Sequence, residues 1–328
     1  MQADLARATE VEDVTTMAAV VLRKFGPPEV LELHEVELVE PGPTEVRVRT
    51  VAAGVNPVDW KTRSGAGFAE LFRRDPKILG WDVAGVVDAV GLGVTRFSVG
   101  DEVFGMPLFP HPAGAYAEAV VAPSRQLARK PARLSMTEAG ALPLAGLTAW
   151  QATVDVGAVG AGTRVLIHAA AGGVGHLALQ IAVARGAEVI ATARRDKHEL
   201  LERLGAAQVI DYESVEFERA CADLDVVVDL VGGEYSLRSL AVLRQGGLLV
   251  SVPSRLPEGL AAAAEAARVR ATGMLVEPDH VGLEQLAALA QAGRLEVLVD
   301  SSFPLAEAAA AHERSESQRA QGKIVLIA

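Results

Sequence analysis

The sequence predicts an α/β protein in two parts, a mostly antiparallel β region followed by a doubly wound parallel sheet. Three observations lead to this prediction. From Met17 to about Leu142, short apolar runs are broken by glycine and proline, as at residues 25–28 (Phe-Gly-Pro-Pro). From about Pro143, apolar runs alternate with helical patterns. One glycine-rich segment joins such a run directly to a helix.

Size and composition limit the class of protein. The chain has 328 residues, which suggests two domains, and half of the residues are hydrophobic. The net charge of −11 argues against nucleic-acid binding, which relies on a basic surface. No apolar run approaches the roughly 20 residues of a membrane span. Cys221 is the only cysteine, which excludes an intrachain disulfide and fits a reducing, cytoplasmic location.

The first part begins with a polar segment and continues as short strands. Residues 1–16 carry acidic side chains before any apolar stretch, unlike a signal or transit peptide, and we expect a disordered extension there. Gly and Pro turns then bound the expected strands, which are at residues 18–22, 46–52, 83–90, 102–104 and 116–121.

The second part alternates strands and helices. Its strands are nearly continuous runs of Val, Ile and Leu, which indicates burial on both faces of a parallel sheet. We expect a doubly wound order of strands at residues 164–168, 188–192, 208–211, 226–230, 248–252 and 270–275. Helices are expected between them at residues 197–204 and 259–267. The last strand would be an apolar sheet edge, which favours pairing with a second copy as a homodimer.

The pattern changes again after Pro278. A helix near residues 283–292 is followed by expected strands at 295–299 and 324–327. We expect these elements to return to the first part of the chain. Residues 17–142 and 278–328 would then form one discontinuous domain, and residues 143–277 the other.

The glycine-rich segment has the layout of a dinucleotide-binding turn. In place of G-x-G-x-x-G the chain has Ala170 at the first glycine position, followed by Gly172 and Gly175. Glycines let backbone amides approach a diphosphate, and the following helix offers unpaired N–H groups at its N-terminus. With Gly173 and Val174 between them, these residues are the predicted cofactor-binding turn.

The residues after the second strand of this sheet favour NADP(H) over NAD(H). An acidic residue is usual there in NAD-binding proteins, but Ala193 holds that place and Arg194 and Arg195 follow. A guanidinium binds a 2′-phosphate through paired hydrogen bonds, whereas a carboxylate would repel it. In the alternative, both arginines are solvated loop residues and Asp196 serves the ribose.

An ordered series of motifs resembles the medium-chain dehydrogenase/reductase superfamily, in its zinc-independent quinone oxidoreductase branch. The motifs are residues 24–31, 53–59, 80–85, 100–105, 143–149, 210–212 and 322–326. The resemblance implies a GroES-like catalytic domain and a Rossmann NADP(H)-binding domain, with the active site in the cleft between them.

Departures from the zinc-using relatives indicate chemistry without a metal. Those relatives have a zinc-binding cysteine where this chain has Asn56, and Gly-His-Glu where it has Gly80, Trp81 and Asp82. Asn and Trp cannot replace thiolate or imidazole ligands, so we predict no metal site. His176, just past the glycine turn, is interpreted as a helix-start residue rather than a catalyst.

Without a metal, charge on the substrate must be stabilised in another way. Hydride transfer places negative charge on a carbonyl oxygen, which hydrogen-bond donors or a cation can stabilise. Conjugation also spreads this charge, which favours a quinone or an α,β-unsaturated carbonyl as the substrate. A small hydrophobic carbonyl compound is therefore the expected partner.

Asn56 and Lys61 are the predicted catalytic residues. The resemblance places Asn56 beside the nicotinamide ribose and the substrate, and a lysine at position 61 beside nicotinamide and substrate. There Lys61 would stabilise the enolate oxygen or donate a proton. The alternatives are an Asn that ends the strand before Pro57 and a surface lysine. Asp59 is expected to cap the following helix or to pair with Lys61 or Arg63.

Other residues are candidates for the pocket and the cofactor. Trp81 lies where zinc-using relatives have their histidine and would wall the pocket, with simple packing as the alternative. Phe104, Met106 and Phe109 are expected on a loop that lines the pocket, where their apolar character would suit a hydrophobic substrate. The resemblance also implies residues for the cofactor. Thr148 would approach the nicotinamide end, Tyr212 the 2′-phosphate and Lys323 the cofactor phosphates. A buried core position is the alternative for Tyr212.

Three functions remain open at this point. The first is an NADPH-dependent, zinc-independent reductase of quinones or α,β-unsaturated carbonyls. The second is a stand-alone enoyl-thioester reductase of polyketide or fatty-acid synthesis, and the third a non-catalytic NADPH-binding protein.

Overall fold

The first part of the chain is built on mostly antiparallel sheets, in which only β15 and β16 of the described strands pair in parallel. The computed structural model describes residues 15–253 and 255–328. Within them, one seven-stranded sheet has the order β15-β16-β3-β5-β6-β8, with β7 paired to β3, and a small sheet has the order β2-β1-β4. The strands of the small sheet are β1 (Thr16–Leu22), β2 (Leu31–Glu37) and β4 (Lys77–Ile78). Those of the larger sheet are β3 (Glu45–Val55), β5 (Val83–Val90), β6 (Glu102–Gly105), β7 (Ala119–Pro123), β8 (Leu127–Arg129), β15 (Val299–Pro304) and β16 (Lys323–Ile327).

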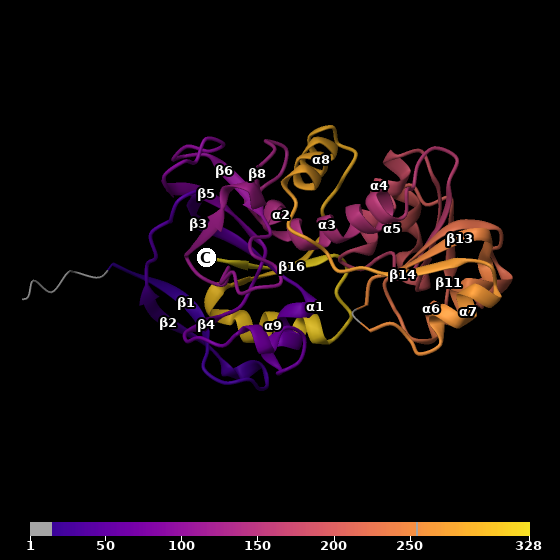
Figure 1. Cartoon of the computed structure of the whole chain (residues 1–328), viewed down its shortest axis with the longest axis horizontal. Helices are drawn as coiled ribbons and strands as arrows, with labels where there is room; N and C mark the ends of the chain where they lie inside the picture. Colours follow the sequence, from indigo (N-terminus) through magenta and orange to yellow (C-terminus); the bar gives the residue numbers. More distant parts are fainter. Residues whose placement is uncertain (1–14, 254) are drawn as a thin grey trace, which may run out of the picture.

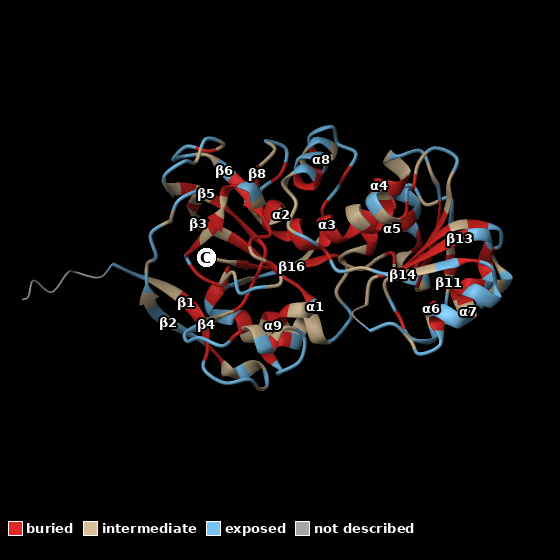
Figure 2. Cartoon of the chain, in the orientation of Figure 1, coloured by how far each residue is buried: buried red, intermediate tan, exposed pale blue. Residues whose placement is uncertain are grey.

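The second part is a six-stranded, all-parallel sheet, as predicted. Its order is β11-β10-β9-β12-β13-β14, the doubly wound arrangement that reverses between β9 and β12. The strands are β9 (Arg164–Ile167), β10 (Glu188–Ala193), β11 (Gln208–Asp211), β12 (Leu224–Asp229), β13 (Leu243–Ser251) and β14 (Arg270–Gly273). Helices between them are α4 (Gly175–Ala184), α5 (His198–Arg203), α6 (Glu234–Ser239) and α7 (Leu260–Ala266). The central strands β9, β10 and β12 are mostly buried, whereas β11 and β14 at the sheet edges are largely half-buried or exposed. Figure 2 shows exposed residues on α6 and α7.

The remaining helices connect the two parts or cover the first. They are α1 (Pro57–Arg63), α2 (Met136–Ala141), α3 (Pro143–Trp150), α8 (His280–Gln291) and α9 (Ala308–Glu316). The last strand, β16, pairs antiparallel with β3, so the end of the chain lies in the sheet of its first part (Figure 1). The exact domain bounds stay a prediction. No helix in residues 15–253 or 255–328 is long and apolar enough to cross a membrane.

The N-terminal extension predicted for residues 1–16 lies mostly outside the described residues. Thr15 and Thr16 are described, and β1 begins at Thr16, one residue before the expected start. The Thr15 carbonyl accepts a hydrogen bond from the Leu38 N–H. Thr15 therefore lies next to the small sheet, and Thr16 belongs to it.

The strand predicted at residues 295–299 is wrong, because β15 begins only at Val299. Leu295 and Val297 are buried, so the apolar residues of this segment alternate as they would in a strand. Their segment docks instead on α4. Gln180 Nε2 donates to the Glu296 carbonyl at 2.9 Å, and the Glu296 N–H donates to Gln180 Oε1 at 2.7 Å. A side chain thus satisfies the polar groups that a neighbouring strand would otherwise pair.

Candidate active site and cofactor-binding turn

The end of strand β3 and the beginnings of strands β16 and β5 lie next to one another in the large sheet. In the antiparallel register, Val55 of β3 lies opposite Ile324 of β16, and Ala52 lies opposite Ala84 of β5. The residue after β3 and the first residue of β16 are therefore neighbours, and the residue just before β5 joins them. These residues are Asn56, Lys323 and Asp82.

The three side chains form a buried polar cluster. Asn56, Asp82 and Lys323 are 1%, 0% and 3% exposed. The Asn56 Nδ2 donates to Asp82 Oδ2 at 2.8 Å, and the Lys323 ammonium donates to Asn56 Oδ1. Lys323 Nζ also lies 3.7 Å from Asp82 Oδ2. At the first turn of α3, the backbone N–H of Leu144 donates to Asp82 Oδ1 at 2.6 Å. The first turn of helix α3 thus contacts the cluster.

Asp82 and Lys323 form an ion pair held by donors. Burial raises the pKa of Asp82 and lowers the pKa of Lys323, and their mutual attraction opposes both shifts. Every group that bonds to the Asp82 carboxyl is an N–H donor, which suits the ionised form. The packing is tight, because a Cβ at Gly54 would lie 2.5 Å from Asp82 Oδ2.

A second buried carboxyl lies beside the cluster. Asp59 Oδ2 accepts the backbone N–H of Asn56 at 2.7 Å, which confirms that Asp59 caps α1. Neither Lys61 nor Arg63 pairs with it, since Arg63 bonds Glu316. Burial raises the pKa of Asp59 to about 7, assisted by the nearby Asp82 and opposed by the Asn56 N–H, Lys323 and Tyr116.

The predicted cofactor turn lies between β9 and α4 and contacts the cluster. A Cβ at Gly173 would lie 3.1 Å from Lys323 Cδ and 3.2 Å from the Gly322 carbonyl. A Cβ at Gly175 would lie 2.3 Å from the Ala169 carbonyl, so only glycine allows this approach of helix to strand. Ala170 is fully buried at the first glycine position, and Gly172 N donates to Ala169 O at 3.0 Å. The turn with Val174 therefore fits the diphosphate of a dinucleotide.

His176 links the turn to the C-terminal segment. Its Nδ1 lies 2.8 Å from the Gly172 carbonyl, and its Nε2 accepts the Leu298 N–H at 3.2 Å. These two partners require the neutral ring with the proton on Nδ1. Burial lowers the pKa of His176 to about 4, which agrees with that form. The expected helix-start role is therefore accompanied by a contact between the two parts of the chain.

The arginines predicted to select the nucleotide lie at the carboxyl edge of the parallel sheet. Ala193 of β10 lies opposite Asp211 of β11, so the next residues, Arg194 and Tyr212, are neighbours. Tyr212 is 42% exposed, so it is not a buried core residue. Arg195 is exposed. The sequence analysis missed Lys197, which pairs with Asp196 at 2.9 Å and brings a further cation to this edge.

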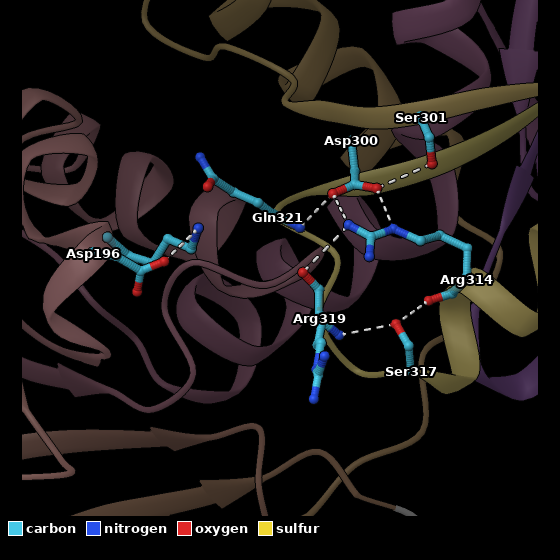
Figure 3. A network of polar contacts seen from close by, with 8 residues as sticks. Asp196, Asp300, Ser301, Arg314, Ser317, Arg319 and Gln321 are labelled. Carbon is cyan, nitrogen blue, oxygen red and sulfur yellow. Dashed lines mark hydrogen bonds and ion pairs between the residues drawn. The ribbon is translucent and has the colours of Figure 1, made fainter.

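A network near the C-terminus holds the segment that leads into β16 (Figure 3). Arg314 of α9 binds both oxygens of Asp300, at 2.7 and 2.9 Å, and Gln321 N donates to Asp300 at 2.9 Å. Gly322 N then donates to the Ala171 carbonyl of the glycine turn at 3.3 Å. Arg319 is exposed on this segment.

The predicted pocket residues are part of the first domain's core. Phe104 and Met106 are fully buried. Trp81 packs edge to face on Phe109 with ring centroids 5.3 Å apart, and its Nε1 donates to the His111 carbonyl at 2.7 Å. The polar N–H of Trp81 is therefore already bonded, and the rest of its ring is apolar.

The structure leaves Lys61 and Thr148 outside the buried cluster. Lys61 is exposed on α1, with Nζ 5.6 Å from the centroid of the Trp60 ring. Thr148 is buried in α3, and its hydroxyl donates to the Leu144 carbonyl at 2.7 Å. The roles predicted for both residues stay predictions.

The side chains at the metal positions of zinc-using relatives do not suit zinc. Asn56 and Trp81 supply no thiolate or imidazole, and Asp82 is already bonded to an ammonium and two N–H groups. Within residues 15–253 and 255–328, no group of three or more His, Cys, Asp or Glu side chains is arranged to hold a metal.

The fold and the turn define an α/β protein built to bind a dinucleotide, and comparisons with known proteins identify its family. The family model "Alcohol dehydrogenase GroES-like domain" matches residues 42–132, and "Zinc-binding dehydrogenase" matches residues 204–326. A 2-haloacrylate reductase from a Burkholderia species is 33% identical, over 95% of this chain and 98% of that protein.

Two solved structures are similar over nearly the whole chain. The quinone oxidoreductase of Coxiella burnetii has a TM-score of 0.90 and 38% identity, and that of Escherichia coli, complexed with NADPH, has 0.83 and 31%. Each match covers 96% of this chain and 100% of the other. The chain therefore belongs to the medium-chain dehydrogenase/reductase superfamily, in its quinone oxidoreductase branch. It is an NAD(P)H oxidoreductase of the quinone oxidoreductase or enone reductase type.

Proposed function

We propose that the protein is an NADPH-dependent, zinc-independent reductase of quinones or α,β-unsaturated carbonyl compounds. The observation that carries this proposal is the buried Asn56 amide, held by Asp82 and by Lys323, whose stem packs against Gly173 of the glycine turn. When bound, NADPH supplies the hydride. The chain must then stabilise negative charge on the acceptor's carbonyl oxygen, and an amide N–H beside an ammonium suits that task.

A panel of acceptors tests this function. Purified protein is mixed with NADPH and a quinone, an enone, an enal or an enoyl thioester, and NADPH consumption is followed. We expect oxidation with quinones or enones. Activity on the thioester alone would favour the enoyl-thioester reductase instead. Tight NADPH binding without oxidation by any acceptor would favour the non-catalytic alternative.

Lys61 is proposed to stabilise the enolate oxygen or to deliver a proton. It is exposed on α1, the helix that follows Asn56, so its long side chain is free to move toward a bound acceptor. We expect Lys61→Ala to lower kcat for an enone about 100-fold or more, in line with the usual contribution of general acid catalysis. A wild-type rate in that variant would remove Lys61 from the mechanism.

Arg194 and Arg195 are proposed to select NADPH, with Tyr212 at the same edge. A lost guanidinium–phosphate contact removes about 1.5–3 kcal/mol. We therefore expect Arg194→Ala to weaken NADPH binding at least 10-fold and to leave NADH binding nearly unchanged, measured by nicotinamide fluorescence. Arg195→Ala is measured beside it. Arg219→Ala is the control, because Arg219 pairs only with Glu216 on the exposed surface. If both cofactors weaken equally, the selection belongs to other residues.

The homodimer is proposed to form through β14. This strand is the edge of the six-stranded sheet, and Leu256 and Leu275 beside it are 43% and 53% exposed. A free edge with apolar neighbours favours pairing with a second copy. Light scattering of the purified chain should give the mass of two copies, and the mass of one copy at micromolar concentration would contradict the dimer.

A further inference from the structure

The Asn56 amide is restricted to one orientation by two opposite charges. Its oxygen faces the Lys323 ammonium, which can only donate, and its nitrogen faces the Asp82 carboxylate, which can only accept. Turning the amide over would place N–H groups against the ammonium and the oxygen against the carboxylate. Both contacts would become repulsive, and both lie in the buried interior, where charge interactions are strong.

This orientation leaves one N–H of Asn56 without an acceptor among the described residues. One Nδ2 hydrogen is used by Asp82, and the described residues supply no acceptor for the second. An amide with its oxygen bonded to an ammonium is also a stronger donor, because the positive charge draws electron density from its N–H groups. The side chain is therefore prepared to donate a hydrogen bond.

Lys323 is itself held by its surroundings. Its register opposite the end of β3 places Nζ at 3.5 Å from the Val55 carbonyl, and Cδ lies against Gly173 of the cofactor turn. The titratable groups around its ammonium are Asp82, Asp59 and, on the turn, His176, whose ring is neutral. In this position the ammonium is buried against Asn56 and the Val55 carbonyl.

We propose that Lys323 is a positioning residue, which with Asp82 holds Asn56 so that its second N–H donates to the oxygen of the hydride acceptor. This inference rests on the proposed function, since it names how the same site stabilises charge on the substrate. Lys323 acts through Asn56 and not by touching the substrate. Lys323 itself transfers neither the hydride nor a proton.

The test compares Lys323→Met and Lys323→Arg with wild type, using the best acceptor of the panel. Met keeps the length of the stem without the charge, and Arg keeps the charge. We expect Lys323→Met to lower kcat about 10- to 100-fold, because loss of one well-placed donor typically has an effect of that order or larger. The NADPH dissociation constant should change less than about 3-fold, and Lys323→Arg should recover part of kcat. The deuterium isotope effect with deuterated NADPH should rise, since hydride transfer becomes slower.

Two further variants separate positioning from a general loss of structure. Lys130→Met removes a partly buried ammonium of the same domain, one that bonds the Leu134 carbonyl at 2.6 Å and Glu102, and should leave kcat unchanged. Asp82→Asn combined with Lys323→Met removes both charges, so the double variant is expected to fold and to show the same low kcat as Lys323→Met.

A readout independent of activity follows the Asn56 amide directly. In spectra of 15N-labelled protein, its two side-chain hydrogens should exchange slowly with water in the wild type and faster in Lys323→Met. Unchanged side-chain signals in Lys323→Met overturn the inference even if the wild type reduces no acceptor. An unchanged kcat with weaker NADPH binding also overturns it, and assigns Lys323 to the cofactor phosphates. Inactivity of the wild type alone contradicts the proposed function and not the orientation of Asn56.

Discussion

Asp82→Asn is expected to lower the free energy of unfolding by about 3–5 kcal/mol at pH 7, because it leaves the buried Lys323 ammonium without its counter-charge. The two oxygens of Asp82 both accept from donors, the Leu144 N–H on one side and the Asn56 Nδ2 on the other. An amide in place of the carboxylate must turn its own N–H groups toward one of them. The variant therefore loses an ion pair and one buried hydrogen bond together. Urea unfolding followed by tryptophan fluorescence measures the change.

The double variant Asp82→Asn, Lys323→Met is the matched control for this loss. Without the ammonium, the Asn56 amide is free to turn over and accept from the new amide, while Leu144 keeps its acceptor. We expect the double variant to be more stable than Asp82→Asn alone. Asp101→Asn is the surface control, because the pair of Asp101 with the half-exposed Arg129 contributes at most about 1 kcal/mol. Similar losses in Asp82→Asn and Asp101→Asn would contradict a buried charged pair.

The stability of the wild type is expected to fall as the pH rises from about 4 to about 7, and Asp59→Asn should remove most of this fall. Burial raises the pKa of Asp59 from its ordinary value of 3.8 to about 7. Between these values the folded protein keeps a proton that the unfolded chain has released. The raised pKa therefore favours folding fully below about pH 4, and its contribution is lost as the pH passes 7. The whole difference is roughly 4 kcal/mol.

Urea unfolding of both proteins between pH 4.5 and 8.5 measures this contribution. The Asp59→Asn amide oxygen is still able to accept the Asn56 N–H, so the helix cap is retained. The variant should gain stability relative to the wild type at pH 8 and not at pH 5. Parallel profiles for the two proteins would show that Asp59 is ionised in the folded state at neutral pH, or that Asp82, Lys323 and Tyr116 titrate in its place.

Local patterns in the chain were sufficient to predict the second sheet. Strands β5 and β11 have the predicted bounds, and the order of the six parallel strands is the predicted one. These elements follow from periodicity and from glycine turns, which act over a few residues. Residues 295–299 show where such local patterns mislead. Their apolar residues alternate as in a strand, but the Glu296 backbone is hydrogen-bonded by the Gln180 side chain, which lies 116 residues away in the sequence.

The buried cluster was predicted only in part. Asn56 and Lys323 were both assigned to the site, but to different tasks, and Asp82 was considered only as a replacement for a metal-binding carboxylate. Their contact depends on the pairing of β16 with β3 and of β3 with β5, which joins residues 267 and 26 positions apart. No local motif encodes such a register.

The amino-acid sequence alone was enough to establish the α/β class, the glycine turn and the family, because each depends on short patterns whose physical requirements are local. Only the tertiary structure determined which charged side chains lie in contact. It brought Lys323 and Asp82 to opposite sides of the Asn56 amide and left Lys61 on the surface. The reason is that burial and opposing charge depend on how distant strands pair, and in a dry interior these interactions determine the orientation of the buried polar groups.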